Sequence, residues 1–408
     1  MSGGTERDTA TAVKDRAEAV LTPLVDFFRA ETVGGAVLLM ATLAALVWAN
    51  SPLGETYEAL WTTELELGTA SFGIREDLRH WVNDGLMVVF FFVVGLEVKR
   101  ELVCGELSDR RAAAMPALAA VGGVVLPAVL FALIVAGGPG SGGWAIPMAT
   151  DIAFAVGALA LLGDRISPGV RLLLLSIAVV DDIIAVAVIA VFYAGDISPA
   201  WLAGAGAGLL ATLGLRRLGV TSILVYVPVG LAVWVATHES GVHATLAGVA
   251  LGLLTPARPV GGRPVLERLE HRLHPLSSSI VIPLFALANA GVYLGGGTLS
   301  EAAGSRLAWA IVAGLVIGKL LGITIAVRLG LVLRAGTLPD DVERREVAGV
   351  AALGGIGFTV SLFITGLAFE EQALQDAAKV GIFAGSLLSA MLGAAIFVFQ
   401  ARRKRLLH

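Results

Sequence analysis

Long uncharged runs of apolar residues constrain this chain more than any other feature of its sequence. Crossing a lipid bilayer as an α-helix takes about 20 predominantly apolar residues, and such runs follow one another along most of the 408 residues. Hydrophobic residues make up 56% of the chain and charged residues only 15%. Because a water-soluble protein of this length needs a more highly charged surface, we predict an all-α polytopic membrane protein.

About twelve transmembrane helices are predicted from these runs. Their approximate bounds are 34–50, 81–98, 113–136, 145–163, 169–193, 199–215, 220–237, 241–255, 276–295, 306–329, 346–369 and 377–400. The transmembrane domain is predicted at 31–400, between an N-terminal tail at 1–30 and a basic tail at 401–408. Residues 17–30 have the pattern of an amphipathic helix at the membrane surface. The N-terminus lacks the features of a cleaved signal peptide, so we expect the tail to remain.

Basic residues alternate between the two sides of the predicted bundle in the way that sets membrane orientation. Lys319 lies within a span, and four of the 29 Lys and Arg residues fall in external segments: Arg75, Arg79, Arg306 and Lys379. The remaining 24 fall in segments that are internal when the N-terminus is cytoplasmic. The positive-inside rule therefore supports twelve spans with both termini in the cytoplasm. We expect the membrane to be a bacterial inner membrane.

Four charged residues lie deep within predicted spans: Asp151, Asp181, Asp182 and Lys319. Asp84 lies nearer the external end of its span and is interpreted as a helix-end group. A charge at the bilayer centre costs about 2.5–3.5 kcal/mol on insertion scales, so it persists only with a partner or a use. These charges are therefore the first candidates for function.

Asp181 and Asp182 are adjacent on one predicted helix, so their side chains point about 100° apart. One carboxylate can pair with Lys319 while the other faces a water-filled cavity. Two neighbouring carboxylates in a poorly solvated site resist double ionisation and titrate as a coupled pair. Protons or a small hard cation such as Na+ or Li+ can neutralise them, and competition for one site produces exchange. A structural ion-pair cluster is the alternative, but one lysine leaves a negative charge unpaired.

Two spans, one in each half of the chain, are interrupted beside polar residues. Pro147 stands one turn before Asp151 in the first span. The second contains Gly354, Gly355 and Gly357. Paired broken helices in the two halves of a transporter predict a midplane site built from half-helix ends, whereas close packing by small residues is the alternative. In a broken span, Asp151 would balance the positive ends of facing half-helices.

Eight segments of the chain closely resemble the NhaA family of bacterial Na+/H+ antiporters. They are NDGLMVVFFFVVGLEVKREL (83–102), ATDIAFAVGALALLG (149–163), VVDDIIAV (179–186), SGVHATLAGV (240–249), RLEHRLHP (268–275), PLFALANAGV (283–292), GKLLGI (318–323) and GGIGFTVSLFI (354–364). The resemblance implies twelve spans in inverted repeats, with two broken helices that cross around 147–151 and 354–358. It also implies electrogenic, pH-regulated exchange of cytoplasmic Na+ or Li+ for external protons.

The same resemblance implies roles for individual residues. Asp182 would be the main carrier of Na+ and protons, with Asp181 as its partner, so that Na+ binds at these two residues. Asp181 would form a salt bridge with Lys319 in one state. Asp151, with Thr150, would lie where the two unwound segments cross.

Further matches to the family are ionisable residues linked to regulation by pH. They are Glu97, Arg100, Glu101, His243, Glu270, His271 and His274. Histidine titrates near neutral pH, and we expect the cytoplasmic members to respond as a cluster. The alternative is an ordinary salt-bridge patch in inward-facing loops.

Parts of the sequence depart from the family pattern. Ile184 stands where Gly is common after the aspartate pair, and Leu320 stands where Pro can follow the lysine. Both changes affect local helix packing and remove no ligand. The external loop 51–79 matches weakly, and it would form a β-hairpin for a homodimer, as in some relatives.

Other functions fit the sequence less well. A Na+-coupled symporter of an organic anion on a related fold is the closest alternative, and it would need a wider cavity. An intramembrane aspartyl protease needs an aspartate in a GxGD context, which none of the buried aspartates has. A channel would not need a lysine beside the carboxylates. With one cysteine, Cys104, and no nucleotide-binding motif, we expect no enzyme activity, no cofactor and no nucleic acid, and we expect Na+, Li+, H+ and the lipid bilayer as partners.

Overall fold

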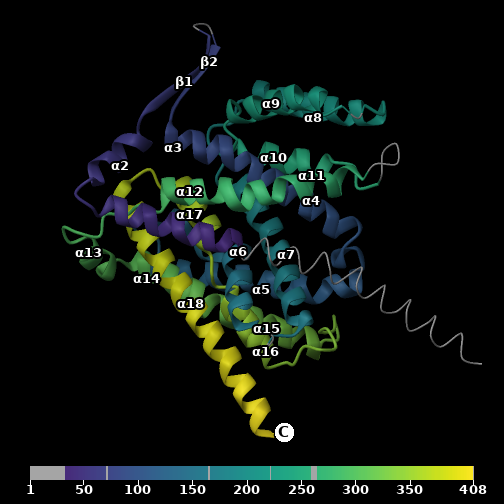
Figure 1. Ribbon diagram of the computed structural model, residues 1–408, viewed down its shortest axis with the longest axis vertical. Coiled ribbons are helices and arrows are strands. Elements are labelled where there is room, and N and C mark those ends of the chain that lie inside the picture. The colour runs from purple at the N-terminus through teal and green to yellow at the C-terminus, as the bar shows by residue number, and fades with distance from the viewer. Residues whose placement is uncertain (1–32, 70–71, 164–165, 221, 259–263, 408) are drawn as a thin grey trace, which may run out of the picture.

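The computed structural model describes residues 33–69, 72–163, 166–220, 222–258 and 264–407. The described chain is predominantly helical (Figure 1). Its first half contains the helices Val33–Ala49, α2 (Gly54–Trp61), α3 (Leu78–His80), η1 (Trp81–Leu86), α4 (Met87–Val103), η2 (Glu106–Ser108), α5 (Arg110–Val135), η3 (Ser141–Met148), α6 (Ile152–Leu162), α7 (Pro168–Phe192) and α8 (Pro199–Arg217). Its second half contains α9 (Ile223–His238), α10 (Thr245–Leu254), α11 (Val265–Leu276), η5 (Ser277–Val281), α12 (Ile282–Asn289), α13 (Thr298–Gly304), α14 (Arg306–Ala313), η6 (Gly314–Gly318), α15 (Lys319–Val332), α16 (Glu346–Leu353), α17 (Phe358–Ala368) and α18 (Gln372–Leu407).

The predicted all-α membrane architecture is confirmed. Every predicted span coincides with one or more helical segments. Within the described chain, five helical stretches are each long and apolar enough to cross a membrane: Arg111–Val135, Ser141–Leu162, Pro168–Phe192, Arg306–Val332 and Gln372–Arg403. Two pairs of helices are also long and apolar enough to cross a membrane when each pair is counted as one bent span. They are Val33–Ala49 with α2, bent by 115°, and α16 with α17, bent by 43°. The predicted amphipathic helix at 17–30 lies outside the described residues.

Some helices extend beyond the predicted spans. The span predicted at 276–295 begins earlier, because α11, η5 and α12 continue one another from Val265 to Asn289. The amphipathic sequence of α11 keeps helical periodicity, so it lengthens the helix rather than forming a loop. In the same way, α18 runs to Leu407 and includes most of the predicted basic tail at 401–408.

The external loop contains the β-hairpin that the resemblance to some relatives predicts. Strands β1 (Glu64–Thr69) and β2 (Phe72–Asp77) pair antiparallel, with Glu64 opposite Asp77 and Leu67 opposite Ile74. The hairpin projects away from the helices (Figure 1). An ion pair between the exposed side chains of Arg75 and Glu64 joins the two strands.

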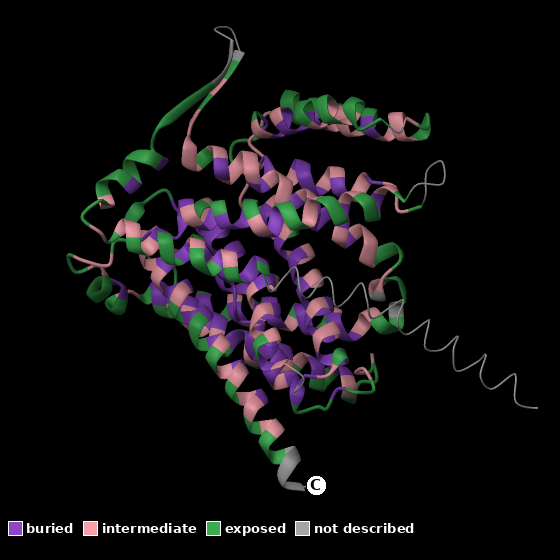
Figure 2. Cartoon of the chain, in the orientation of Figure 1, coloured by how far each residue is buried: buried purple, intermediate pink, exposed green. Residues whose placement is uncertain are grey.

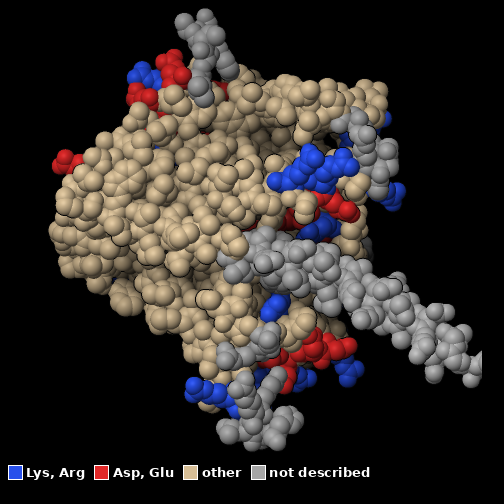
Figure 3. All heavy atoms as spheres, in the orientation of Figure 1, with Lys and Arg blue, Asp and Glu red and all other residues tan. Residues whose placement is uncertain are grey.

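Burial divides the helices into an enclosed centre and an exposed outer layer. α8 and α9 pack against each other and lie beyond α10, and their outward faces are exposed (Figures 1 and 2). In Figure 3 this face of the molecule is mainly uncharged. The charged side chains gather in two places, over α11 and, lower in the view, over α16 and near the end of α18, with a smaller group near the hairpin (Figures 1 and 3). A large uncharged surface is what contact with lipid requires.

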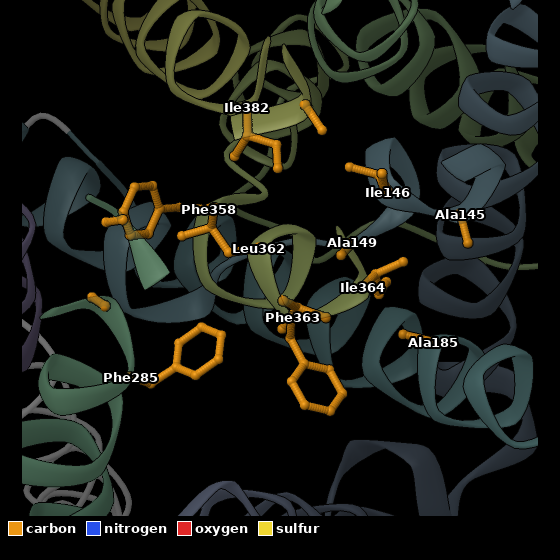
Figure 4. Close-up of a cluster of buried hydrophobic side chains, with 14 of the residues drawn as sticks. Ala145, Ile146, Ala149, Ala185, Phe285, Phe358, Leu362, Phe363, Ile364 and Ile382 are labelled. Carbon is orange, nitrogen blue, oxygen red and sulfur yellow. The ribbon is translucent and has the colours of Figure 1, made fainter. Parts of the chain in front are cut away.

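The centre of the hydrophobic core is α17. Figure 4 shows its side chains Phe358, Leu362, Phe363 and Ile364 directed toward different neighbours. Those neighbours are Ala145 and Ile146 of η3, Ala185 of α7, Phe285 of α12 and Ile382 of α18. Because an apolar core packs at high density, contacts on all sides fix the position of α17 and of the helix break that precedes it.

Candidate functional site

The two predicted helix breaks are present, and they cross. In the first half, η3 ends at Met148 and α6 begins at Ile152. In the second half, α16 ends at Leu353 and α17 begins at Phe358. The Asp151 backbone N–H donates to the carbonyl of Ile356 at 2.6 Å, so the two non-helical segments are in direct contact. This crossing brings unsatisfied backbone groups of four half-helix ends to one place.

Glycines allow the crossing to be this close. A Cβ atom at Gly355 would collide with the carbonyl oxygen of Leu315, and one at Gly357 would lie 2.9 Å from the carbonyl oxygen of Ala149. Pro147 lies within η3, and a Cβ atom at Gly314 would lie 2.6 Å from its side chain. The small residues therefore serve both predicted purposes, because they interrupt a helix and permit close packing.

Asp151 satisfies the N-termini of both half-helices with one carboxylate. Its Oδ1 accepts from the backbone N–H of Phe154 at 3.0 Å and caps α6. Its Oδ2 accepts from the backbone N–H of Thr359 at 3.0 Å and from the Thr359 hydroxyl at 2.7 Å. Backbone N–H groups at a helix start carry partial positive charge, so the negative charge of Asp151 balances the two facing helix ends.

Asp181, Lys319 and Thr150 form a buried cluster beside the crossing. Asp181 Oδ2 forms an ion pair with Lys319 Nζ, and Thr150 Oγ1 lies 2.6 Å from the same oxygen. Lys319 Nζ also donates to Thr150 Oγ1 at 3.0 Å. The exposed fractions are 0% for Lys319, 1% for Asp181 and 2% for Thr150, so water contributes little to neutralising these charges. Asp181 Oδ1 has no hydrogen-bond partner within the described part of the chain.

Thr150 connects this cluster to the second helix break. Its hydroxyl also lies 2.8 Å from the carbonyl oxygen of Gly354, so one proton has two acceptors available. Lys319 follows the π-helical turn η6, and such turns are frequent at functional sites because they re-aim the next side chain. Direct contacts through the Thr150 hydroxyl therefore join Lys319 to both helix breaks.

Asp182 faces a different environment from its neighbour. It lines a cavity of about 50 Å³ together with Thr150, Asp151 and Thr359, which is enough room for water. Among the described residues, its carboxylate makes no hydrogen bond or ion pair. The charged groups that act on it are Asp181, Glu97, Asp151 and Lys319, three of them acidic. An unpaired buried carboxylate beside water is able to bind a proton or a small cation.

The ionisable residues near the end of α4 and on α11 form one network. Arg100 forms an ion pair with Glu270 and donates to Glu101 at 3.1 Å. Glu97 lies 3.6 Å from His274, and both line the cavity that contains Asp182. Burial raises the pKa of the Glu270 carboxyl, and the Arg100 guanidinium opposes this shift.

Two predicted pH-response residues form no ion pair with that network in the described part of the chain. His271 is exposed on α11. His243 lies before α10, near Phe363, and the groups that act on it electrostatically are Asp84 and His238. Asp84 precedes Glu97 by 13 positions, which corresponds to about 20 Å along a helix. The structure therefore does not bring His243 into the Glu97–Glu270 cluster.

Three polar residues of the site were not singled out from the sequence. Thr359 binds Asp151, and its signal is its place two residues after Gly357 in the second break. Ser277 and Ser278 line the cavity, and their signal is the run of three serines after the amphipathic helix. Within the described residues, no group of three or more His, Cys, Asp or Glu side chains is arranged to hold a resident metal ion.

Comparison with known proteins decides the family. A family model described as Na+/H+ antiporter 1 matches residues 25–397. The chain belongs to this family. It is 47% identical to Na(+)/H(+) antiporter NhaA 3 of Frankia alni over 92% of the chain and 88% of that protein. It is 46% identical to an NhaA antiporter of Nocardia farcinica, over 94% and 92%, and 44% identical to one of Shewanella pealeana, over 90% and 95%. The predicted family is confirmed, and the long apolar helices of this chain make it a multi-pass membrane protein.

Glu270 gives the antiporter a predicted pH-dependent stability. Its folded pKa lies above the ordinary value of 4.5, so unfolding releases a proton between that value and the folded pKa. The free energy of unfolding then falls as pH rises through this window, by about 1.4 kcal/mol for each unit of pKa shift. Glu270→Gln lacks this titration, so we expect its melting temperature relative to wild type to increase from pH 4 toward neutrality.

The exposed Glu267 on the same helix provides the matched control for Glu270. Glu267→Gln also replaces a carboxyl on this helix, but an exposed one, so we expect a much smaller pH-dependent difference in melting temperature from wild type than for Glu270→Gln. A constant difference in melting temperature between Glu270→Gln and wild type would contradict this origin of the pH dependence.

Proposed function

We propose that the chain is a secondary transporter that exchanges Na+ for H+ and uses Asp182 as the carrier. The observation that carries the proposal is the contrast between two adjacent carboxylates. Asp181 pairs with Lys319 and Thr150, whereas Asp182 lines a water-sized cavity without a protein partner in the described chain. Carboxylate and hydroxyl oxygens suit a hard monovalent cation, and the same carboxylate binds protons.

Competition for this site accounts for coupling. Na+ that enters the cavity meets the Asp182 carboxylate, with the Thr150 and Thr359 hydroxyls among the lining groups. Its binding displaces a proton, because the low-dielectric site does not hold both positive charges. The ion pair between Asp181 and Lys319 would then break or form again as the two broken helices rearrange. Opening of the site to the other side would let protons displace Na+.

Electrogenic exchange follows if both carboxylates take part. One Na+ carries a single charge, whereas Asp181 and Asp182 together offer two proton sites. Each net charge that crosses the membrane is worth about 2.3 kcal/mol per 100 mV. The membrane potential would therefore drive Na+ out of a cell whose interior is negative. Li+ has the same charge and ligand preference, so we include it as a substrate.

The charged network at the ends of α4 and α11 would face the cytoplasm and regulate entry. Glu97 and His274 line the same cavity as Asp182, so their charge states set the local potential for an entering cation. We assign both termini to the cytoplasm and the protein to the bacterial inner membrane. As an antiporter it is a transporter and catalyses no covalent chemistry.

Na+-induced collapse of a proton gradient in everted membrane vesicles tests the proposal. We expect Na+ and Li+ to dissipate the gradient, and choline at the same ionic strength to leave it intact. No organic anion should be required. A response that appears only after an organic anion is added would favour the symporter and overturn antiport.

We further propose that the hairpin joins two copies of the chain. Its strands project from the helices (Figure 1). Their outer edges carry unpaired backbone groups beside the exposed Glu64 and Arg75, and a second copy can extend the sheet there. Deleting residues 66–75 should convert a detergent-solubilised dimer to a monomer, measured by light scattering with size exclusion. An unchanged mass would show that the hairpin does not hold a dimer.

A further inference from the structure

Two serine hydroxyls in the cavity have no partner that the structure supplies. Ser277 and Ser278 have exposed fractions of 2% and 4%, and both line the cavity with Asp182, Glu97 and His274. Neither hydroxyl makes a hydrogen bond within the described part of the chain. Buried hydroxyls are normally satisfied, so two unsatisfied ones on residues that line the cavity indicate a missing partner.

Local structure holds these hydroxyls in place. Ser277 and Ser278 begin the π-helical turn η5, which joins α11 to α12. The Cβ of Ser278 lies against Gly34 of the helix Val33–Ala49, at 2.9 Å from where a Cβ of Gly34 would be. A serine inside an ordinary helix can return its hydroxyl to the carbonyl one turn earlier, and neither of these does so. No protein group in the described chain therefore uses the lone pairs of these two oxygens.

The chemistry of the lining fits a partly dehydrated monovalent cation. Glu97 supplies negative charge, and the serines supply neutral oxygen ligands, on a surface that also includes Asp182. An ion that contacts these protein oxygens exchanges some of its hydration water for them. Hydroxyls can do this without trapping the ion, since binding along a transport path must also permit release.

We propose that Ser277 and Ser278 form a Na+ entry site, between Glu97 and the carrier Asp182, where the ion loses part of its water. This proposal rests on the exchange function proposed above and adds a second, weaker cation site to it. The hydroxyls lower the cost of dehydration before Na+ reaches Asp182. They carry no charge and bind no transported proton, so they affect the affinity for Na+ and not the number of protons exchanged.

The test is the double variant Ser277→Ala/Ser278→Ala in everted vesicles, with the initial rate measured against Na+ concentration. We expect the apparent KM for Na+ to rise about tenfold, in line with lost ligands to a charged group, with a maximal rate within about twofold of wild type. Ser277→Thr keeps the hydroxyl and should retain the wild-type KM. An unchanged KM, or a lost maximal rate with unchanged KM, overturns the entry site.

Ser279→Ala is the matched control, because Ser279 belongs to the same turn and does not line the cavity. It should leave KM unchanged, and an equal rise in KM there would overturn the proposal. As a second measurement, Na+ should raise the melting temperature of the purified double variant less than that of wild type, and an equal rise would overturn it. Failure of the exchange function itself is distinguishable, because wild type would then show no response to Na+.

Discussion

Asp182→Asn is expected to abolish Na+-driven proton movement, with a fall of at least about 100-fold in the initial rate at a fixed Na+ concentration. A ligand to a charged group is worth up to about 3 kcal/mol, which corresponds to roughly that factor in an equilibrium constant. Asparagine keeps the size of the side chain but binds neither a proton nor a cation with a full negative charge. Collapse of a proton gradient in vesicles on addition of Na+ measures the loss.

The same substitution should leave the fold intact. Asp182 makes no hydrogen bond or ion pair with another described residue, so its replacement removes no protein contact of that kind. We expect the melting temperature of Asp182→Asn in detergent to equal or exceed that of wild type, because a buried negative charge is removed. Asp196→Asn, in an exposed loop, is the control and should exchange Na+ normally. Near wild-type exchange by Asp182→Asn would remove the carrier role from this residue.

The number of partners separates the three buried aspartates. Asp151 accepts three hydrogen bonds that stabilise two helix ends. Asp181 uses one oxygen for Lys319 and Thr150 and leaves the other without a partner in the described chain. Asp182 uses neither oxygen for a described residue. The Asp151 carboxylate is therefore used to stabilise the fold, whereas the Asp182 carboxylate is free to bind an ion or a proton. The three aspartates look alike in the sequence, but their surroundings give them different chemistry.

Much of the fold could be predicted because the membrane imposes simple rules. Apolar runs of sufficient length predicted helices, and each predicted span coincides with helical structure. The Pro147 region and the glycines at 354–357 predicted the two breaks, since local sequence controls where a helix ends. The 100° separation of adjacent residues on a helix places Asp181 on Lys319 and Asp182 on the cavity, because α7 is regular at that point.

Other features depend on contacts between distant segments. Thr359 reaches Asp151 only because the breaks cross, and no local pattern encodes a contact across 208 positions. The π-helical turns at Ser277–Val281 and Gly314–Gly318 follow from packing rather than from a sequence period. The separation of His243 from Glu97 likewise required knowledge of how α10 lies along α4. The family resemblance assigns both His243 and Glu97 to the pH response, but it does not say how far apart they lie.

Lys319→Met is expected to lower the free energy of unfolding by about 3–5 kcal/mol, the usual cost of breaking a buried ion pair. Lys319 and Asp181 are almost completely buried, and the pair also includes the Thr150 hydroxyl. Methionine fills a similar volume, so the loss reflects the unpaired Asp181 charge rather than a cavity. The deficit should shrink as pH falls, because a protonated Asp181 needs no cation. Thermal unfolding of the purified protein in detergent measures both effects.

The double variant Lys319→Met/Asp181→Asn separates charge from packing. Removing both charges leaves neither member of the pair as an uncompensated ion, so we expect the double variant to recover most of the stability that Lys319→Met loses. The resulting coupling free energy isolates the ion pair. If the losses of the two single variants simply add, Lys319 stabilises the bundle through its aliphatic stem, and Asp181 is neutralised by a proton in the resting protein. Recovery of stability without recovery of exchange would show that the pair is required for transport as well as for the fold.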